Sequence, residues 1–290
     1  MSITTAPERG TTAPLPVSVR GVARSFDGAT RDAPARHVLR GIDLEIRAGE
    51  IVALIGPSGC GKSTLLREIS GLDAPTAGTV SIGGETVSGI DLRCAVGFQE
   101  PRLLPWRTIE SNVSLGLPRG TSSASGANRV AELLELVGLP GSRTLRPRQV
   151  SGGMAQRASL ARALARGPGV LVLDEPFGAL DALTRLRMQD LLLDVHRAEP
   201  ATILLVTHDV DEALYLADRV VLLAQDPDGP EGASIRRILS VPGARPRDRG
   251  DATLAALRAE LLDGLGVASH HQSTTAPADR LPASPAKDHR

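Results

Sequence analysis

Residues 56 to 63 read Gly-Pro-Ser-Gly-Cys-Gly-Lys-Ser, and this segment constrains the fold of the 290-residue chain more than any other. It follows the apolar run Ile51 to Ile55 and precedes the helix-like stretch Thr64 to Ser70. A strand, a glycine-rich loop and a helix in this order form the context in which such a loop holds phosphate. The segment therefore predicts a nucleoside triphosphate site at the start of a helix.

Each residue type in this loop has a physical reason to be there. Glycines let the backbone turn tightly, so that successive N–H groups point at an anion. The helix that follows presents the positive end of its dipole to the same phosphates. Lys62 adds a charge for the β and γ phosphates, and the Ser63 hydroxyl can bind Mg²⁺. The residues predicted to bind the nucleoside triphosphate are Gly56, Pro57, Ser58, Gly59, Cys60, Gly61, Lys62, Ser63 and Thr64.

Composition excludes several classes of protein. The 33 basic residues balance the 33 acidic ones, which disfavours a nucleic-acid partner. The two cysteines, Cys60 and Cys94, do not make a disulfide framework, and their usage fits a reducing cytosol. No stretch approaches the roughly 20 apolar residues that a membrane-spanning helix needs. We therefore expect a chain that stays in the cytoplasm or reaches the membrane through a partner.

The apolar pattern predicts an ordered middle between two unstructured ends. Val17 to Phe26 and Leu39 to Ile46 alternate like antiparallel edge strands, whereas Ile51 to Ile55 is typical of a buried parallel strand. Further short strands are predicted at Thr79–Ile82, Val170–Leu173 and Ile203–Val206, and helices at Val130–Val137, Ala158–Ala165 and Leu254–Leu262. Residues 1–15 and 269–290, and the Gly/Ser-rich insertion Arg119 to Asn128, are predicted to be unstructured.

Two carboxylates follow the predicted strand Val170 to Leu173. At the carboxyl end of a sheet strand, Asp174 and Glu175 would lie beside the phosphate loop. Asp174 would then complete the Mg²⁺ shell, and Glu175 would polarise the attacking water as a general base. The alternative is a strand that ends in solvated acids, and the phosphate loop upstream disfavours it.

Two more polar sites have the same kind of placement. Ser151, Gly152 and Gly153 open a helix and form a second anion site, which a head-to-tail dimer could place over the γ phosphate of the opposite copy. From these residues alone, an ordinary capped helix remains open. His208 follows the predicted strand Ile203 to Val206, where its imidazole can donate to a phosphate oxygen. An unliganded loop histidine is the alternative there.

Taken together, these motifs resemble the nucleotide-binding subunits of ATP-binding-cassette (ABC) transporters over about residues 17 to 265. The Ser151 segment, Gly178 to Asp181, Gln99 and His208 occur in the family's order. The resemblance implies an α/β fold with a P-loop NTPase core and parallel sheet, an antiparallel β-subdomain and an inserted helical subdomain. It places the ATPase domain at 16–268 and the helical subdomain at about 100–165.

The resemblance also implies roles for single residues. Gln99 would sense Mg²⁺ and water and couple to the membrane partner, Asp181 would contact the opposite protomer, and His208 would reach the γ phosphate. Phe26 would stack on adenine, although packing against the core or a loop is an alternative. The chain departs from the family at Val150 and Met154, where Leu and Gln are frequent. Because Ser151 and the two glycines are present, we expect activity to survive this departure.

The segments Phe98 to Trp106 and Asp181 to Arg185 resemble the nitrate/sulfonate/taurine import branch, and most of all the aliphatic sulfonate importers. This implies a homodimer on the cytoplasmic face of the cell membrane, docked on two permease subunits and served by a periplasmic or lipoprotein solute-binding protein. A nitrate or taurine importer is the alternative, followed by a non-transport regulatory ATPase. Trp106 either packs between helices or anchors the membrane partner, with Leu103 and Leu104 beside it.

Other classes of ATPase lack one of these features or need one that is missing here. A chromosome-maintenance ATPase would carry a long coiled coil between Gln99 and Ser151, and a cassette translation factor would carry two phosphate loops. A small-molecule kinase would lack the Ser151 segment. A regulatory cassette without activity would lack Glu175 or His208, and both are present.

Overall fold

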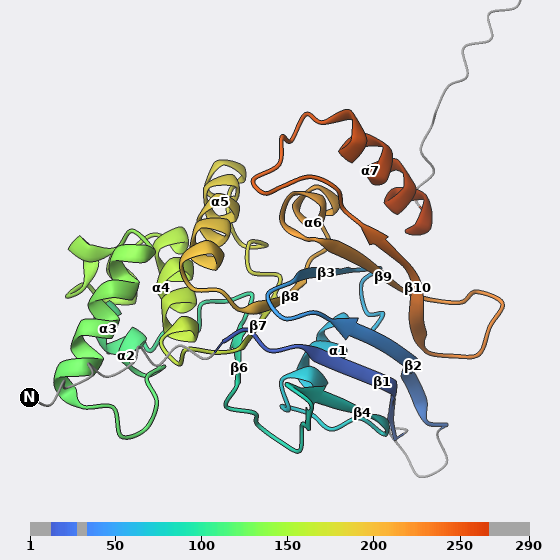
Figure 1. The fold of residues 1–290 in the computed structure, drawn as a ribbon, viewed down its shortest axis with the longest axis horizontal. Coiled ribbons are helices and arrows are strands. Elements are labelled where there is room, and N and C mark those ends of the chain that lie inside the picture. The colour runs from blue at the N-terminus through green and yellow to red at the C-terminus, as the bar shows by residue number, and fades with distance from the viewer. Residues whose placement is uncertain (1–12, 28–33, 267–290) are drawn as a thin grey trace, which may run out of the picture.

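The computed structural model describes residues 13–27 and 34–266, which form a ten-stranded sheet with helices on both faces (Figure 1). The strand order is β5-β4-β1-β2-β10-β9-β3-β8-β7-β6. The strands are β1 (Val17–Phe26), β2 (Arg36–Ile46), β3 (Ile51–Ile55), β4 (Ala77–Ile82), β5 (Glu85–Thr86), β6 (Cys94–Gly97), β7 (Val170–Asp174), β8 (Thr202–Val206), β9 (Arg219–Gln225) and β10 (Ala233–Ser240). The helices are α1 (Lys62–Ile69), α2 (Ile109–Ser114), α3 (Ser123–Leu136), α4 (Gly152–Leu164), α5 (Ala182–Ala198), α6 (Val210–Leu216) and α7 (Ala252–Gly264), with short 3-10 turns at Pro140–Ser142 and Pro147–Gln149.

The sheet has an antiparallel part and a parallel part, as the sequence predicts. β1 pairs antiparallel with both β2 and β4. β3 lies between β8 and β9, and the ladders β3–β8, β3–β9, β7–β8 and β6–β7 are all parallel. β3 and β8 are buried along their whole length, which explains why they read as continuous apolar runs rather than alternating ones.

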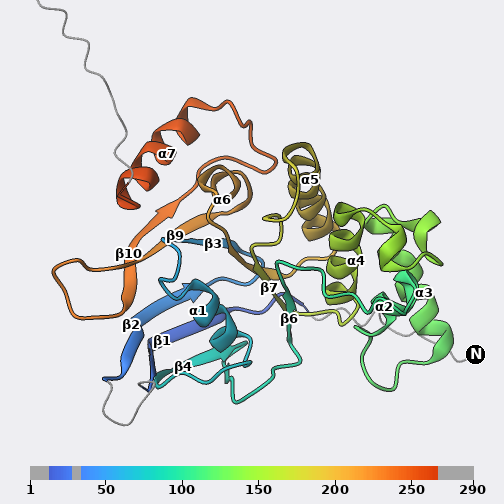
Figure 2. The same cartoon turned by 180° about the vertical axis from the view of Figure 1, so that it is seen from behind.

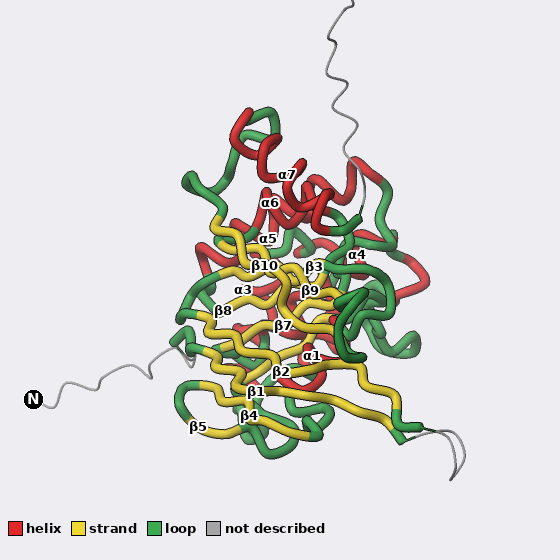
Figure 3. The backbone as a smooth tube through the Cα atoms, turned by 90° about the vertical axis from the view of Figure 1, so that its right-hand side faces the viewer, coloured by secondary structure: helices red, strands yellow, loops and turns green. Residues whose placement is uncertain are grey.

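Strand alternation divides the interior into two cores. Val52 and Leu54 of β3 join a core that contains α1 and the antiparallel strands. Ile51, Ala53 and Ile55 point to the opposite face and join the larger core with α4, α5, α6 and α7. Figure 3 shows α1 on one side of the curled sheet and α5, α6 and α7 on the other. The phosphate loop, between β3 and α1, is thus supported from both faces.

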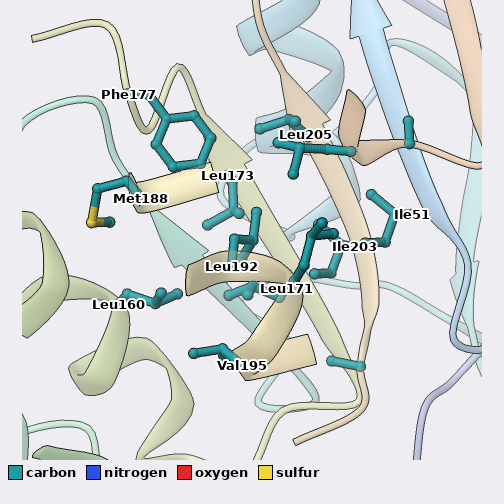
Figure 4. Close-up of a cluster of buried hydrophobic side chains, with 14 of the residues drawn as sticks. Ile51, Leu160, Leu171, Leu173, Phe177, Met188, Leu192, Val195, Ile203 and Leu205 are labelled. Carbon is teal, nitrogen blue, oxygen red and sulfur yellow. The ribbon is translucent and has the colours of Figure 1, made fainter. Parts of the chain in front are cut away.

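Helices α2, α3 and α4 gather at the β6 end of the sheet (Figure 2). Their attachment runs through the larger core, where Leu160 of α4 and Leu192 of α5 approach Leu171 and Leu173 of β7 (Figure 4). Burying a leucine of this kind stabilises the fold by about 1.5–3 kcal/mol. The predicted α/β fold with a parallel core, an antiparallel part and a helical part is confirmed.

The prediction of an unstructured insertion at Arg119 to Asn128 is wrong in its second half. Helix α3 begins at Ser123, and the Ser122 side chain caps it by accepting from the backbone N–H of Ser125. Gly126 is buried, and a β carbon there would lie 2.9 Å from the Leu117 side chain. Close packing against Leu117 therefore overrides the low helix propensity of a Ser/Gly segment.

The predicted tails, residues 1–15 and 269–290, lie outside the described residues except for 13–15. Leu15 there donates to the carbonyl of Gly169 and accepts from the Thr202 hydroxyl, which ties the start of β1 to the parallel sheet. In the described part of the chain, no helix combines the length and the apolar character needed to cross a bilayer.

Candidate functional site: a phosphate loop beside a carboxylate cluster

The phosphate loop has a backbone that only glycine can adopt at several points. Gly59 and Gly61 have φ angles of 78° and 99°, in the left-handed region. At Gly56 a β carbon would lie 2.1 Å from the carbonyl oxygen of Leu223. Gly61 is also the N-cap of α1 and offers no side-chain cap, so the first N–H groups of that helix are left for a ligand.

Lys62 is buried, yet its ammonium group has no carboxylate partner among the described residues. Its Nζ atom donates to the carbonyl oxygens of Gly56 and Pro57, both at 2.9 Å. These bonds curl the side chain back over the loop. A buried cation that is satisfied only by carbonyl groups is an attractive site for a phosphate.

The carboxylates lie where the sequence predicts them. Asp174 is the last residue of β7, and its Oδ1 atom accepts from the Ser63 hydroxyl at 3.1 Å. Burial raises the pKa of Asp174, and the bond from Ser63 partly opposes this. Glu175 follows with a φ of 45°, and its backbone N–H donates to the carbonyl of Val206. A non-glycine residue in this region costs about 1–3 kcal/mol, and such strain is frequent at functional sites.

Two side chains approach the Glu175 carboxylate. Its Oε2 atom lies 3.5 Å from Gln99 Nε2 and 3.3 Å from His208 Nδ1. Gln99, Glu175 and His208 follow β6, β7 and β8, which are neighbouring parallel strands. The carboxyl ends of these strands lie at one edge of the sheet, so residues far apart in sequence come together there.

A pocket of about 390 Å³ joins the phosphate loop and Glu175 to Phe26; Gln99, Asp174 and His208 do not line it. The predicted site residues that line it are Phe26, Ser58, Gly59, Gly61, Lys62, Ser63, Thr64 and Glu175. Phe26 is 43% exposed, so it is not a core residue. The Cys60 side chain instead lines a neighbouring hollow behind the loop, and burial raises the pKa of its thiol. Both cysteines are free, and Cys94 is buried in β6, as predicted.

The Ser151 segment does not line this pocket. Ser151 caps α4 by accepting from the backbone N–H of Met154 at 3.3 Å, and Gly152 is the first residue of the helix. Ser151 and Gly153 border a separate groove of about 590 Å³ between α3, α4 and α5. Asp181 is exposed at the N-cap of α5, where it accepts from the Thr184 backbone N–H. The two predicted anion sites of one chain are therefore separate.

Contacts that sequence reasoning missed hold the Gln99 loop against α4. Gln156 Nε2 donates to the carbonyl of Phe98 at 3.2 Å, just before Gln99. Arg162 donates to the carbonyls of Pro101 and Arg102, each at 2.8 Å. The helix that starts at the Ser151 segment is thus bonded to both flanks of this loop. The sequence signal was weak: Gln156, Arg157 and Arg162 are polar side chains in a helix of mainly small and apolar residues.

A second unpredicted contact joins α5 to the segment that carries His208. Arg185 lies 3.5 Å from the Asp209 carboxylate and also donates to the carbonyl of Leu180, next to Asp181. Asp209 in turn caps α6 by accepting from the N–H groups of Asp211 and Glu212. His208 and Asp181 are therefore linked through a short chain of polar contacts.

Glu212, on α6, gives the fold a pH dependence. Burial raises the pKa of its carboxyl from 4.5 to about 7; the charge of Asp209 adds to this, while bonds from Thr207 and Gln189 oppose it. The folded protein therefore keeps a proton that the unfolded chain loses, so this group makes stability fall as the pH rises from about 4.5 to 7. We expect Glu212→Gln to raise the melting temperature by roughly 2–4 °C at pH 8.

Near pH 5 the same variant should differ little from the wild type, because Glu212 is then protonated in the folded state. Thermal unfolding followed by circular dichroism at both pH values checks this. An equal shift at both would show that the charge on Glu212 is not the cause.

Comparison with known proteins agrees with this site. The sequence profile of the ABC transporter family matches residues 39–178. The chain is 52% identical over 229 residues to aliphatic sulfonates import ATP-binding protein SsuB 2 of Burkholderia lata, covering 79% of this chain and 81% of that protein. It is 53% identical over 228 residues to aliphatic sulfonates import ATP-binding protein SsuB 1 of Rhodococcus jostii, covering 79% and 87%.

Among solved structures, the chain resembles an ATP-binding cassette in a dimeric post-hydrolysis state bound to ADP and Pi. The TM-score is 0.66 at 31% sequence identity, and the match covers 79% of this chain and all of the other. The phosphate loop, the carboxylates at the end of β7 and the Ser151 segment all fall within the segment that the family profile matches. The chain belongs to the ABC transporter family, as one of its ATP-binding cassette ATPases.

Proposed function

We propose that this chain energises the import of aliphatic sulfonates by hydrolysing ATP. The choice of substrate is supported by the sequence identity of about 50% to the curated sulfonate import proteins, over four-fifths or more of their length. A nitrate or taurine importer is the second candidate, because Phe98 to Trp106 also resembles that branch. A regulatory cassette without activity is disfavoured by the contact between Glu175 and His208.

In this proposal, residues 16–268 form the ATPase domain, with the helical subdomain at about 100–165. ATP lies in the pocket between Phe26 and the phosphate loop, with its phosphates against Lys62 and the first turn of α1. The oxygen atoms of Ser63 and Asp174 are the ligand type that Mg²⁺ prefers, and they already lie 3.1 Å apart. They would hold Mg²⁺ together with Gln99; the ion, when bound, neutralises charge on the β and γ phosphates.

Glu175 is the proposed general base. Its carboxylate lines the pocket. The left-handed backbone at this residue and the contacts with Gln99 and His208 fix its position. It would accept a proton from the attacking water, which Gln99 helps to orient. His208 is 61% exposed at its side chain and would turn an N–H toward the γ phosphate. A positioned base of this kind contributes about 10²–10⁴ to a rate.

The catalytic unit in this proposal is a head-to-tail homodimer. Ser151, Gly152 and Gly153 of one protomer cover the γ phosphate held by Lys62 of its partner, and Asp181 lies at the interface. Two observations support this arrangement. The groove at Ser151 is separate from the nucleotide pocket of the same chain, and the solved cassette that the chain resembles is dimeric.

Opening and closing of this dimer would drive two permease subunits, with a periplasmic or lipoprotein binding protein delivering the solute. The chain would then work at the cytoplasmic face of the membrane. Trp106 is 68% exposed, which disfavours packing between helices and supports the proposal that it anchors the membrane partner. Leu103, near Trp106 in the sequence, is half-buried against the larger core. The hydrogen bonds from Gln156 and Arg162 to the Gln99 loop would transmit movement of this loop to α4.

Growth tests this function. A strain lacking the chain should fail to grow with an alkanesulfonate as sole sulfur source, and still grow on sulfate. The wild-type chain should restore growth. Trp106→Ala should restore it poorly, while the purified variant keeps its basal ATP hydrolysis. If growth is lost on nitrate or taurine instead, the chain belongs to a nitrate or taurine importer. Unimpaired growth on every source would remove the import assignment.

A further inference from the structure

The Phe26 ring does not stand alone at the rim of the nucleotide pocket. Arg24 lies two residues earlier on β1, and side chains at this spacing share a face of the strand. Its guanidinium carbon lies 4.6 Å from the centre of the Phe26 ring. One face of the ring is therefore covered by a cation.

A backbone carbonyl holds the guanidinium of Arg24 in place. Arg24 donates through one terminal nitrogen to the carbonyl of Ala74, in the segment between α1 and β4. Its Nε atom is buried and has no hydrogen-bond partner within residues 13–27 and 34–266, and the same is true of both carboxylate oxygens of Glu68 on α1. Glu68 is only 1% exposed. Burial raises the pKa of its carboxyl to about 7, and the charge of Arg24 opposes this.

Arg24 therefore links the Phe26 ring to the segment that follows α1, and its charge acts on the Glu68 carboxyl. Glu68 lies on the helix that starts at the phosphate loop, and Phe26 ends the strand that borders the pocket. The bond to Ala74 fixes the guanidinium, and with it the ring, relative to the segment that leaves α1. A cation against one face of an aromatic ring also leaves only the other face for a stacking partner.

We propose that Arg24 is a positioning residue for the nucleobase: it backs the Phe26 ring and so favours stacking of a purine on the free face. The inference rests on the proposed ATP site and extends it to base recognition. A purine presents a larger π surface than a pyrimidine, so an oriented and polarised ring should favour purine nucleoside triphosphates. The phosphate groups do not touch Arg24 in this arrangement and should not sense its loss.

Binding of ATP, UTP and inorganic tripolyphosphate to the purified chain separates these contributions. We expect Arg24→Gln to weaken ATP binding about fivefold, in the range of a partly buried cation–π contact. Tripolyphosphate, which has no base, should bind equally well to both proteins. The KM for ATP should rise by the same factor with kcat unchanged, and the preference for ATP over UTP should fall.

A double-mutant comparison tests whether Arg24 acts through Phe26. In a Phe26→Leu background, Arg24→Gln should no longer change the affinity for ATP. Arg24→Lys keeps the charge over the ring and should retain most of the ATP preference. Arg20→Gln is the matched control, because Arg20 is on the same strand but pairs with Glu45 at the exposed surface. It should bind all three ligands as the wild type does.

Two results would overturn the inference. One is an equal loss of ATP and tripolyphosphate binding in Arg24→Gln, which would indicate a general charge or folding effect. The other is a fivefold loss that persists in the Phe26→Leu background. If Phe26→Leu itself leaves the ratio of ATP to tripolyphosphate affinity unchanged, then the proposed adenine contact at Phe26 is what fails.

Discussion

Glu175→Gln is expected to bind ATP as tightly as the wild type while hydrolysing it at least about a hundredfold more slowly. The amide has the shape of the carboxylate, so it keeps the contacts near Gln99 and His208 but cannot accept the proton from water. Because the phosphate loop is untouched, ATP should still close the dimer. The variant should therefore accumulate as an ATP-bound dimer, visible by size-exclusion chromatography with ATP and absent with ADP.

The matched control is Glu132→Gln, which removes an exposed carboxylate on α3 far from the phosphate loop. It should hydrolyse ATP at the wild-type rate. Normal turnover by Glu175→Gln would show that another group accepts the proton. Loss of ATP binding together with turnover would indicate that Glu175 holds the loop in place rather than acting as a base.

Mixing two inactive variants should restore activity if the site is shared between protomers. Lys62→Ala removes the buried cation of the phosphate loop, and we expect that chain alone to lose ATP binding. Ser151→Arg fills the start of α4 with a large side chain and should abolish hydrolysis while leaving the phosphate loop intact. A mixed dimer has one complete site, made from Lys62 of one chain and Ser151 of the other.

Equal amounts of the two variants should recover about a quarter of the wild-type activity, since random pairing makes about half of the dimers mixed and each has one complete site. Two Lys62→Ala preparations, differently tagged and mixed in the same way, should stay inactive. A mixture of the two variants that also stays inactive would contradict the shared site. It would then leave Ser151 as an ordinary helix cap, the alternative that the sequence alone left open.

The parallel core was predictable because its strands are buried on both faces. The ranges expected for β1 and β3 match those observed, and β7 and β8 each extend by one residue. β10 was not predicted because a register shift between Ile235 and Arg237 interrupts its alternation. Helix α5 was also missed, although Asp181 at its N-cap is a start signal.

For the site, short motifs placed the phosphate loop and the carboxylates, because their chemistry is local in sequence. The meeting of Gln99, Glu175 and His208 follows from the order of parallel strands, which only the resemblance supplied. The contacts of Arg24, Arg162 and Arg185 could not be predicted, since the Ala74 and Pro101 carbonyls and the Asp209 carboxylate that they reach lie far away in the sequence.

The central claim is that ATP hydrolysis by this chain drives sulfonate entry, and uptake of a labelled alkanesulfonate measures it directly. Cells that lack the chain are given back the wild type or Glu175→Gln, and uptake is followed with taurine, nitrate and sulfate as competitors. The account predicts uptake with the wild type, none with Glu175→Gln, and little competition from the other solutes. Uptake that continues with Glu175→Gln, or in cells without the chain, would contradict it.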